Sequence, residues 1–140
     1  MEYVLIATDS DALAEDLDAT LGDDRCEVGR VHSGAEVSES VRTRQPDLVV
    51  LDLQIGNMGG MATSLHLRNE AGGGRLAPQN ILLLLDRTAD VFLARESEAD
   101  GWMIKPIDSF RLRRAAQAVA EGRSWREHAD GTIETDEPVG

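Results

Sequence analysis

Short apolar runs recur along the chain, and their length limits the fold more than any other feature of the sequence. They lie at residues 3–7, 27–31, 47–52, 81–85 and 101–105. Runs this short, rich in branched side chains and bounded by polar turns, are typical of β-strands. The third and fourth runs, DLVVLD and ILLLL, are apolar at consecutive positions, as expected of strands buried on both faces.

Amphipathic segments separate these runs and predict helices. In the first segment, Leu13, Leu17 and Leu21 recur every four residues and mark one helix face. The apolar face of the last segment consists of Leu112, Ala115, Ala116 and Val119. Strands that alternate with helices predict an α/β domain over residues 1–122, with a five-stranded parallel sheet and helices on both faces.

Composition narrows the choice of partners. At 140 residues the chain has the size of one domain, and its net charge of −12 argues against nucleic acid or an anionic membrane. A divalent cation or a basic protein surface suits this charge better. The single cysteine, Cys26, permits no internal disulfide and predicts a cytoplasmic location. No run reaches the length of a membrane span, and no secretion signal opens the sequence.

The end of the chain differs in composition from the rest. After Gly122 the sequence becomes polar and acidic and ends in DGTIETDEPVG. Few apolar residues and many charges predict disorder. Residues 123–140 are therefore expected to form an acidic, disordered tail that adds nothing to the core.

Polar side chains stand where the predicted strands end. They are Thr8 and Asp9 after the first strand, Asp52 at the end of the third, Asp86 after the fourth and Lys105 at the end of the fifth. The carboxyl ends of parallel strands meet at one edge of a sheet, where such folds bind ligands. Carboxylate oxygens suit Mg²⁺, and a nearby lysine makes an aspartate a competent phosphoryl acceptor. A single strand-end aspartate is more often a turn former, so only the set favours a site.

Three segments occur in this order: VLIATDSD, PDLVVLDLQIGNMGG and ADGWMIKPID. They resemble, respectively, the acidic metal-binding segment, the phosphoacceptor segment and the closing strand of the response-regulator receiver domain of two-component signalling. The resemblance covers residues 3–122. It implies a flavodoxin-like (βα)5 fold with strand order 2-1-3-4-5.

The resemblance also implies roles for single residues. Asp52 would be the phosphoacceptor, and Mg²⁺ would be held by Asp9, Asp52 and the backbone carbonyl of Gln54. Lys105 would contact the phosphoryl group, and the bond between Lys105 and Pro106 is commonly cis in this family. The glycines after Asp52 let backbone N–H groups approach an anion.

Four positions depart from the family pattern. Thr8 replaces the first member of the acidic pair, and Gly56 replaces a loop proline. Asp86 stands near the place of a serine or threonine that contacts the phosphoryl group. Trp102 occupies the position of the switch aromatic, where its bulk hinders rotation. The acceptor is retained and the usual switching is altered, as in atypical stand-alone receivers of the actinobacterial type.

The leading interpretation is a single-domain response regulator, not an enzyme, that a histidine kinase phosphorylates on Asp52 in a Mg²⁺-dependent reaction. No DNA-binding segment follows, so the signal would pass to an effector protein through the fourth helix, fifth strand and fifth helix, and a homodimer is one option. Arg111, Arg113 and Arg114 stand out on the last helix and are candidates for binding the partner. The alternative for these arginines is a solvated helix face.

Two other functions remain open. A pseudo-receiver would bind its partner without phosphorylation, and Asp52 would then be an ordinary strand-end residue. The DSD motif at residues 9–11 is also similar to the nucleophile motif of haloacid-dehalogenase-type phosphatases. In that reading Asp9 would attack phosphate and Asp11 would act as acid and base, but the chain is too short for that fold with its cap.

Overall fold

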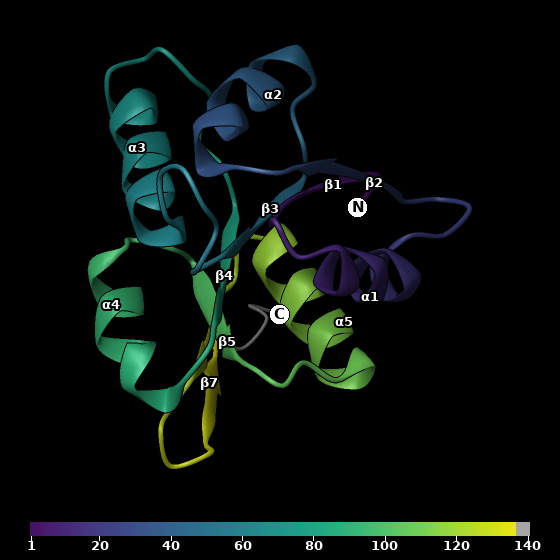
Figure 1. Cartoon of the computed structure of the whole chain (residues 1–140), viewed down its shortest axis with the longest axis vertical. Helices are drawn as coiled ribbons and strands as arrows, with labels where there is room; N and C mark the ends of the chain where they lie inside the picture. The colour runs from purple at the N-terminus through teal and green to yellow at the C-terminus, as the bar shows by residue number, and fades with distance from the viewer. Residues whose placement is uncertain (137–140) are drawn as a thin grey trace.

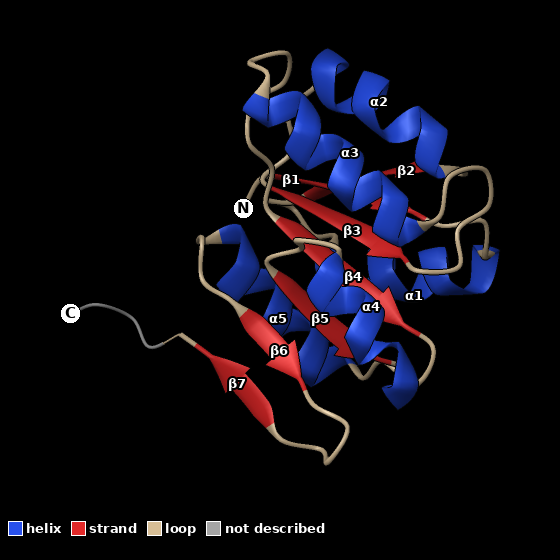
Figure 2. Ribbon diagram, turned by 90° about the vertical axis from the view of Figure 1, so that its left-hand side faces the viewer, coloured by secondary structure: helices blue, strands red, loops and turns tan. Residues whose placement is uncertain are grey.

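A computed structural model describes residues 1–136, and one seven-stranded sheet runs through it (Figure 1, Figure 2). The strands are β1 (Tyr3–Ala7), β2 (Glu27–Val31), β3 (Leu48–Asp52), β4 (Ile81–Leu85), β5 (Gly101–Ile104), β6 (Trp125–Glu127) and β7 (Ile133–Thr135). The α-helices are α1 (Asp11–Leu21), α2 (Val37–Thr43), α3 (Gly60–Gly72), α4 (Val91–Glu96) and α5 (Ser109–Ala120). Two short 3₁₀ helices, η1 (Gly34–Glu36) and η2 (Thr88–Asp90), precede α2 and α4.

The strand order is β2-β1-β3-β4-β5-β6-β7, and its first five strands have the predicted order 2-1-3-4-5. Neighbouring strands from β2 through β6 run parallel, whereas β7 is antiparallel to β6. Along the centre of the sheet Ile6 lies beside Val50, and Val50 lies beside Leu82. The predicted flavodoxin-like α/β fold is therefore confirmed.

Alternate residues of the central strands contribute to two separate cores. Ile6 and Val50 pack on the face covered by α1 and α5, whereas Leu51 and Leu83 pack on the face covered by α2, α3 and α4 (Figure 1). Every residue of β3 and β4 is buried, which explains why these strands are apolar at consecutive positions. Within residues 1–136, no helix has the length and apolar character needed to span a membrane.

The prediction of a disordered tail is wrong for residues 123–136. β6 and β7 form a hairpin that continues the sheet beyond β5 (Figure 2). Trp125 is 4% exposed and packs in the core beside α5. Gly101 permits this approach, because a Cβ there would lie 2.7 Å from the carbonyl oxygen of Trp125. Average composition concealed the hairpin, since a single buried tryptophan anchors an otherwise polar segment. Residues 137–140 of the predicted tail lie outside the described residues.

Glu127 ties the hairpin to β5 and α5. Its buried carboxylate accepts hydrogen bonds from the backbone N–H of Ile104 at 2.8 Å, Arg111 Nε at 2.5 Å and Trp125 Nε1 at 3.1 Å. Its backbone carbonyl accepts a hydrogen bond from Trp102 Nε1 at 2.9 Å. A buried charge with this many donors is costly to alter, because each donor would lose its partner.

We expect Glu127→Gln to lower the free energy of unfolding by about 1–3 kcal/mol, because the amide cannot accept all three side-chain and backbone donors. Urea unfolding followed by circular dichroism measures this change. Glu134→Gln is the matched control, since Glu134 lies in β7 and, among residues 1–136, its pairs with Arg126 and His128 are at the surface. The control should change stability by less than about 0.5 kcal/mol. Equally small losses in both variants would contradict a docked hairpin.

Candidate functional site

Asp52 ends β3 and is the centre of the site. Its side chain is 5% exposed, and β3 lies between β1 and β4. Lys105, which follows β5, places its ammonium 2.9 Å from Asp52 Oδ1. The backbone N–H of Gln54 donates to the same oxygen at 3.3 Å. The ion pair and this hydrogen bond compensate the cost of burying the carboxylate.

Thr8 lies on the β1 side of Asp52 and is buried. Its hydroxyl donates a hydrogen bond to Asp52 Oδ2 at 2.8 Å and accepts one from the N–H of Ser10 at 3.1 Å. Arg30, from β2, donates through Nε and Nη2 to the carbonyl of Thr8 at 3.2 and 3.0 Å. A neutral hydroxyl thus occupies the place of an acidic ligand, and both oxygens of Asp52 are hydrogen-bonded.

Lys105 is the sole lysine of the chain, and it bridges two carboxylates. Besides Asp52, its ammonium contacts Asp86 Oδ1 at 2.8 Å. The other oxygen, Asp86 Oδ2, is buried and has no hydrogen-bond partner among the described residues. Burial opposes the charge on Lys105, but hydrogen bonds and charges from Asp86 and Asp52 outweigh it and raise the pKa of Lys105. An incoming anion would compete with Asp86 for this ammonium.

Asp9 is exposed and lies beside the loop that follows β3. A Cβ at Gly56 would lie 3.4 Å from Asp9 Oδ2, an ordinary contact distance, so the carboxylate lies next to this part of the loop. Within residues 1–136, no three His, Cys, Asp or Glu side chains gather into a metal-binding group. Two carboxylates and a backbone carbonyl still suit Mg²⁺, because this ion keeps several of its waters.

Two glycines that flank the loop after Asp52, Gly60 at the start of α3 and Gly34 in η1, are required for close packing. A Cβ at Gly60 would lie 2.6 Å from the carbonyl oxygen of Asp52. Across the loop, the N–H of Gly34 donates to the carbonyl of Gly56 at 3.3 Å, and a Cβ at Gly34 would lie 1.9 Å from the carbonyl oxygen of Met58. The loop is therefore fixed to η1 by backbone contacts that larger residues would block.

Residues 4–117 match the model of the response regulator receiver domain. The chain belongs to the response-regulator receiver family. The DNA-binding response regulator MtrA of Mycolicibacterium smegmatis is 32% identical to it over 99% of this chain and 60% of MtrA. The nitrate/nitrite response regulator NarL of Escherichia coli is 30% identical over 68% of this chain and 43% of NarL. The receiver therefore spans less than two thirds of the length of these relatives.

Solved receiver domains share this architecture. The receiver domain of a signal transduction histidine kinase from Syntrophus aciditrophicus has a TM-score of 0.76 and 26% identity, covering 87% of this chain and 92% of its own. The signal receiver domain of NarL from Mycobacterium tuberculosis has a TM-score of 0.73 and 24% identity, covering 86% and 96%. Both likenesses confirm the receiver fold.

The other predicted site residues lie in different surroundings: some contact the rest of the domain, and others are exposed. Trp102 is 3% exposed, and its indole is fixed by the carbonyl of Glu127. Arg111 is a candidate for partner binding, but its guanidinium pairs with Glu127 and donates to the carbonyl of Ile104 at 2.8 Å. These contacts connect α5 to β5 and β6 within the domain. The exposed helix face retains Arg113 and Arg114.

Sequence reasoning missed two residues that position the site. Arg30 donates two hydrogen bonds to the Thr8 carbonyl. In the sequence, the one indication of this role is a single cation within a strand whose apolar pattern is weak. Glu127 fixes the end of β5, and nothing in an acidic tail distinguishes a buried carboxylate from exposed ones. Asp11, the second acid of the DSD motif, pairs with Arg30 at 2.8 Å and has a side chain 82% exposed. This position does not support the acid–base role that the phosphatase hypothesis gives to Asp11.

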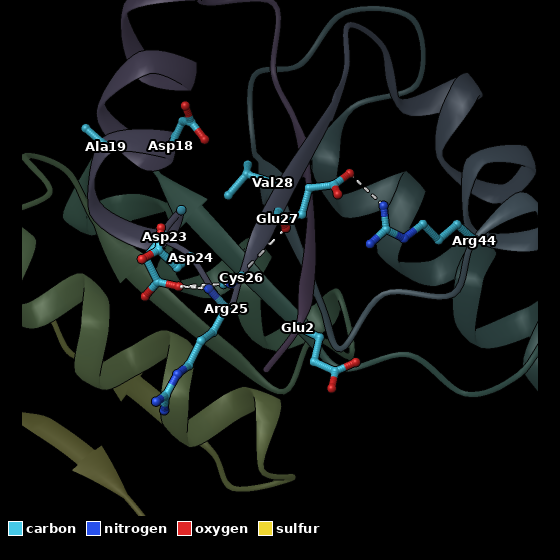
Figure 3. A pocket seen from close by; sticks show the side chains of 11 residues that line it. Glu2, Asp18, Ala19, Asp23, Asp24, Arg25, Cys26, Glu27, Val28 and Arg44 are labelled. Atoms are coloured by element: carbon cyan, nitrogen blue, oxygen red, sulfur yellow. Dashed lines mark hydrogen bonds and ion pairs between the residues drawn. The ribbon is translucent and has the colours of Figure 1, made fainter.

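A hollow separate from the site around Asp52 lies near the amino ends of β1 and β2, at the opposite edge of the sheet (Figure 3). Two of its acidic residues, Asp23 and Glu27, already have partners. Asp23 Oδ1 accepts the backbone N–H groups of Arg25 and Cys26 at 2.7 and 2.9 Å, and Glu27 pairs with Arg44 at 2.6 Å. Burial raises the pKa of the Cys26 thiol, which disfavours the reactive thiolate. These groups stabilise a turn and a strand.

We expect Lys105 to titrate above 10.5, and Asp86→Asn to lower its pKa by removing one of two charges that hold the proton. Because the folded-state pKa is raised, this ion pair stabilises the fold fully below about pH 10.4 and is lost as pH rises through the folded-state value. Biosynthetic ¹³C-labelling of lysine leaves the ammonium unaltered, and because Lys105 is the single lysine its Cε resonance reports the titration by NMR. Asp11→Asn is the control, since Asp11 pairs with Arg30 and its removal should leave the pKa of Lys105 unchanged. Titration of wild-type Lys105 at or below 10.5 would contradict the bridge.

Proposed function

We propose that this receiver accepts a phosphoryl group on Asp52 from a histidine kinase and signals by contact with an effector protein. The observation that carries the proposal is the 2.9 Å pair between Lys105 and Asp52 at the carboxyl edge of the sheet. A fixed cation beside a buried carboxylate suits a reaction that adds negative charge at this point.

The donor set at this edge suits Mg²⁺. Asp9, Asp52 and the backbone carbonyl of Gln54 would hold the ion, with waters completing its shell. When bound, Mg²⁺ supplies neutralisation of the charge shared by the carboxylates and the phosphoryl oxygens. Thr8 leaves one acidic ligand fewer than the family pattern, so we expect weak binding.

Phosphoryl transfer requires a small rearrangement around Asp52. One carboxylate oxygen forms a bond to phosphorus while the phosphorus–nitrogen bond of phosphohistidine breaks, and the imidazole leaves with the electron pair. Since Lys105 holds Oδ1 and Thr8 holds Oδ2, one of these contacts must be released first. Lys105 then turns toward the transferred phosphoryl oxygens as a point charge.

Asp86 opposes this transfer in two ways. It holds Lys105 at 2.8 Å, and its charge repels the arriving phosphoryl group where the family pattern has a hydroxyl. In a partly solvated site, this repulsion amounts to about 1–2 kcal/mol. Phosphorylation of Asp52 is therefore expected to be about tenfold slower than without the Asp86 charge.

One observation favours the pseudo-receiver as a second candidate. Asp52 is satisfied without any ligand, because Thr8, Lys105 and the N–H of Gln54 all donate to it. A site complete in itself can support binding by the rest of the domain with no chemistry. The two candidates differ in whether Asp52 can be covalently labelled.

We expect wild-type protein treated with acetyl phosphate and Mg²⁺ to gain the mass of one phosphoryl group, detected by intact-mass spectrometry. Asp52→Asn should gain none, because the amide is not nucleophilic. Asp9→Ala should lose most of the Mg²⁺ dependence, because one of two acidic ligands is gone. Equal labelling of wild type and Asp52→Asn would place the acceptor elsewhere, and no labelling at all would favour the pseudo-receiver.

Asp86→Asn should speed labelling by about tenfold, since it removes the competing charge and keeps the shape of the side chain. The initial rate of mass gain with acetyl phosphate measures the effect. Asp11→Asn is the matched control, because it removes an exposed carboxylate at the start of α1 and should leave the rate unchanged. If Asp86→Asn labels no faster than this control, Asp86 does not limit the reaction.

A further inference from the structure

A hollow with basic walls lies between α5 and the β6–β7 hairpin. Its volume is about 440 Å³, and its walls include Arg113, Arg114, Arg123, Trp125 and Thr135. None of these residues belongs to the phosphoryl site. The hairpin contributes part of the wall, so this basic hollow exists only because residues 123–136 are folded onto the sheet.

The charge of the hollow is opposite to that of the chain, which carries a net charge of −12. Arg123 is paired with Glu121 at 3.0 Å. Arg113 and Arg114 are exposed, and neither forms an ion pair with a described Asp or Glu. Two uncompensated guanidinium groups therefore face solvent beside one hollow, where most arginines of the chain are neutralised by nearby acids.

Two aromatic rings lie near one of these arginines. The guanidinium of Arg114 lies 5.7 Å from the ring centre of Phe110 and 6.0 Å from that of Trp125, within cation–π range. Trp125 is buried, whereas Phe110 is 70% exposed. An arginine of the hollow thus lies beside an exposed aromatic ring, and arginines and aromatic residues are enriched in protein interfaces.

We propose that the basic hollow is a docking surface for an acidic segment of a partner protein. Arg113 and Arg114 bind its carboxylates, and Phe110 contacts an apolar side chain within the same segment. Charge complementarity identifies the occupant, because two free guanidinium groups on an acidic domain select a short acidic segment and not a long polyanion. A nucleic acid would also meet the negative remainder of the surface. The proposal goes beyond phosphoryl transfer and does not depend on it, since Asp52 contributes nothing to the hollow.

The test uses the full chain and a fluorescein-labelled peptide of four glutamates around one phenylalanine, with fluorescence anisotropy as the readout. We expect saturable binding that weakens as salt rises. The double variant Arg113→Gln/Arg114→Gln should raise Kd by about tenfold, since both carboxylate contacts are lost. The matched control is Arg25→Gln/Arg95→Gln, which makes the same charge change at exposed positions outside the hollow and should change Kd by less than about twofold.

Several results would overturn the docking surface. They are absence of binding to wild type, equal weakening in both double variants, equal binding of a peptide with glutamines in place of glutamates, or tighter binding of an oligothymidylate of similar charge. Asp52→Asn should bind the peptide like wild type. Loss of phosphoryl labelling and loss of peptide binding are therefore separable, and each tests its own proposal.

Discussion

The ion pair between Lys105 and Asp52 is the constraint on which the site depends. A carboxylate buried at the edge of an apolar sheet is unfavourable unless a cation and hydrogen bonds compensate it. Lys105 supplies that cation from the end of β5, across β4, so β3 and β5 are coupled although they are not neighbours in the sheet. Any reaction that changes the charge on Asp52 must therefore change the contacts of Lys105.

The end of β5 also connects the site to the C-terminal hairpin. Lys105 directly follows Ile104, whose N–H donates to the carboxylate of Glu127, and Trp102 donates to the carbonyl of the same residue. Glu127 in turn pairs with Arg111 on α5. The hairpin covers the edge of β5 and also fixes the strand end that carries the lysine. Hydrogen bonds, together with the peptide bond between Ile104 and Lys105, thus link Asp52 to the helix that carries the basic hollow.

Features that follow from local periodicity could be predicted from the sequence, and those that rest on distant pairing could not. Strand length and apolar pattern predicted the first five strands, and the resemblance to receiver domains implied their order, which places Asp52 and Lys105 at one edge of the sheet. The hairpin could not be predicted from the sequence, because its anchor is one tryptophan in a polar segment. The packing of Trp125 also depends on Gly101, which lies far earlier in the chain. The contact of Arg111 with Glu127 could not be predicted for the same reason, since Glu127 lies within that segment.

Relative to the family pattern, this chain lacks an acid at position 8, where it has Thr8, and has an additional acid at Asp86. The total charge of the site is unchanged, but it is distributed differently on the two sides of β3. Asp9, Asp52 and Asp86 contribute −3 and Lys105 contributes +1, so the four groups sum to −2, as three acids and one lysine do in the family pattern. In the proposed reaction an arriving phosphoryl group would replace Asp86 at Lys105, and exchanging one anion for another would alter the lysine less than a first anion would. The end of β5 would then be held similarly in both states. This argues for an output surface that exists before phosphorylation, as the hollow formed by α5 and the hairpin does.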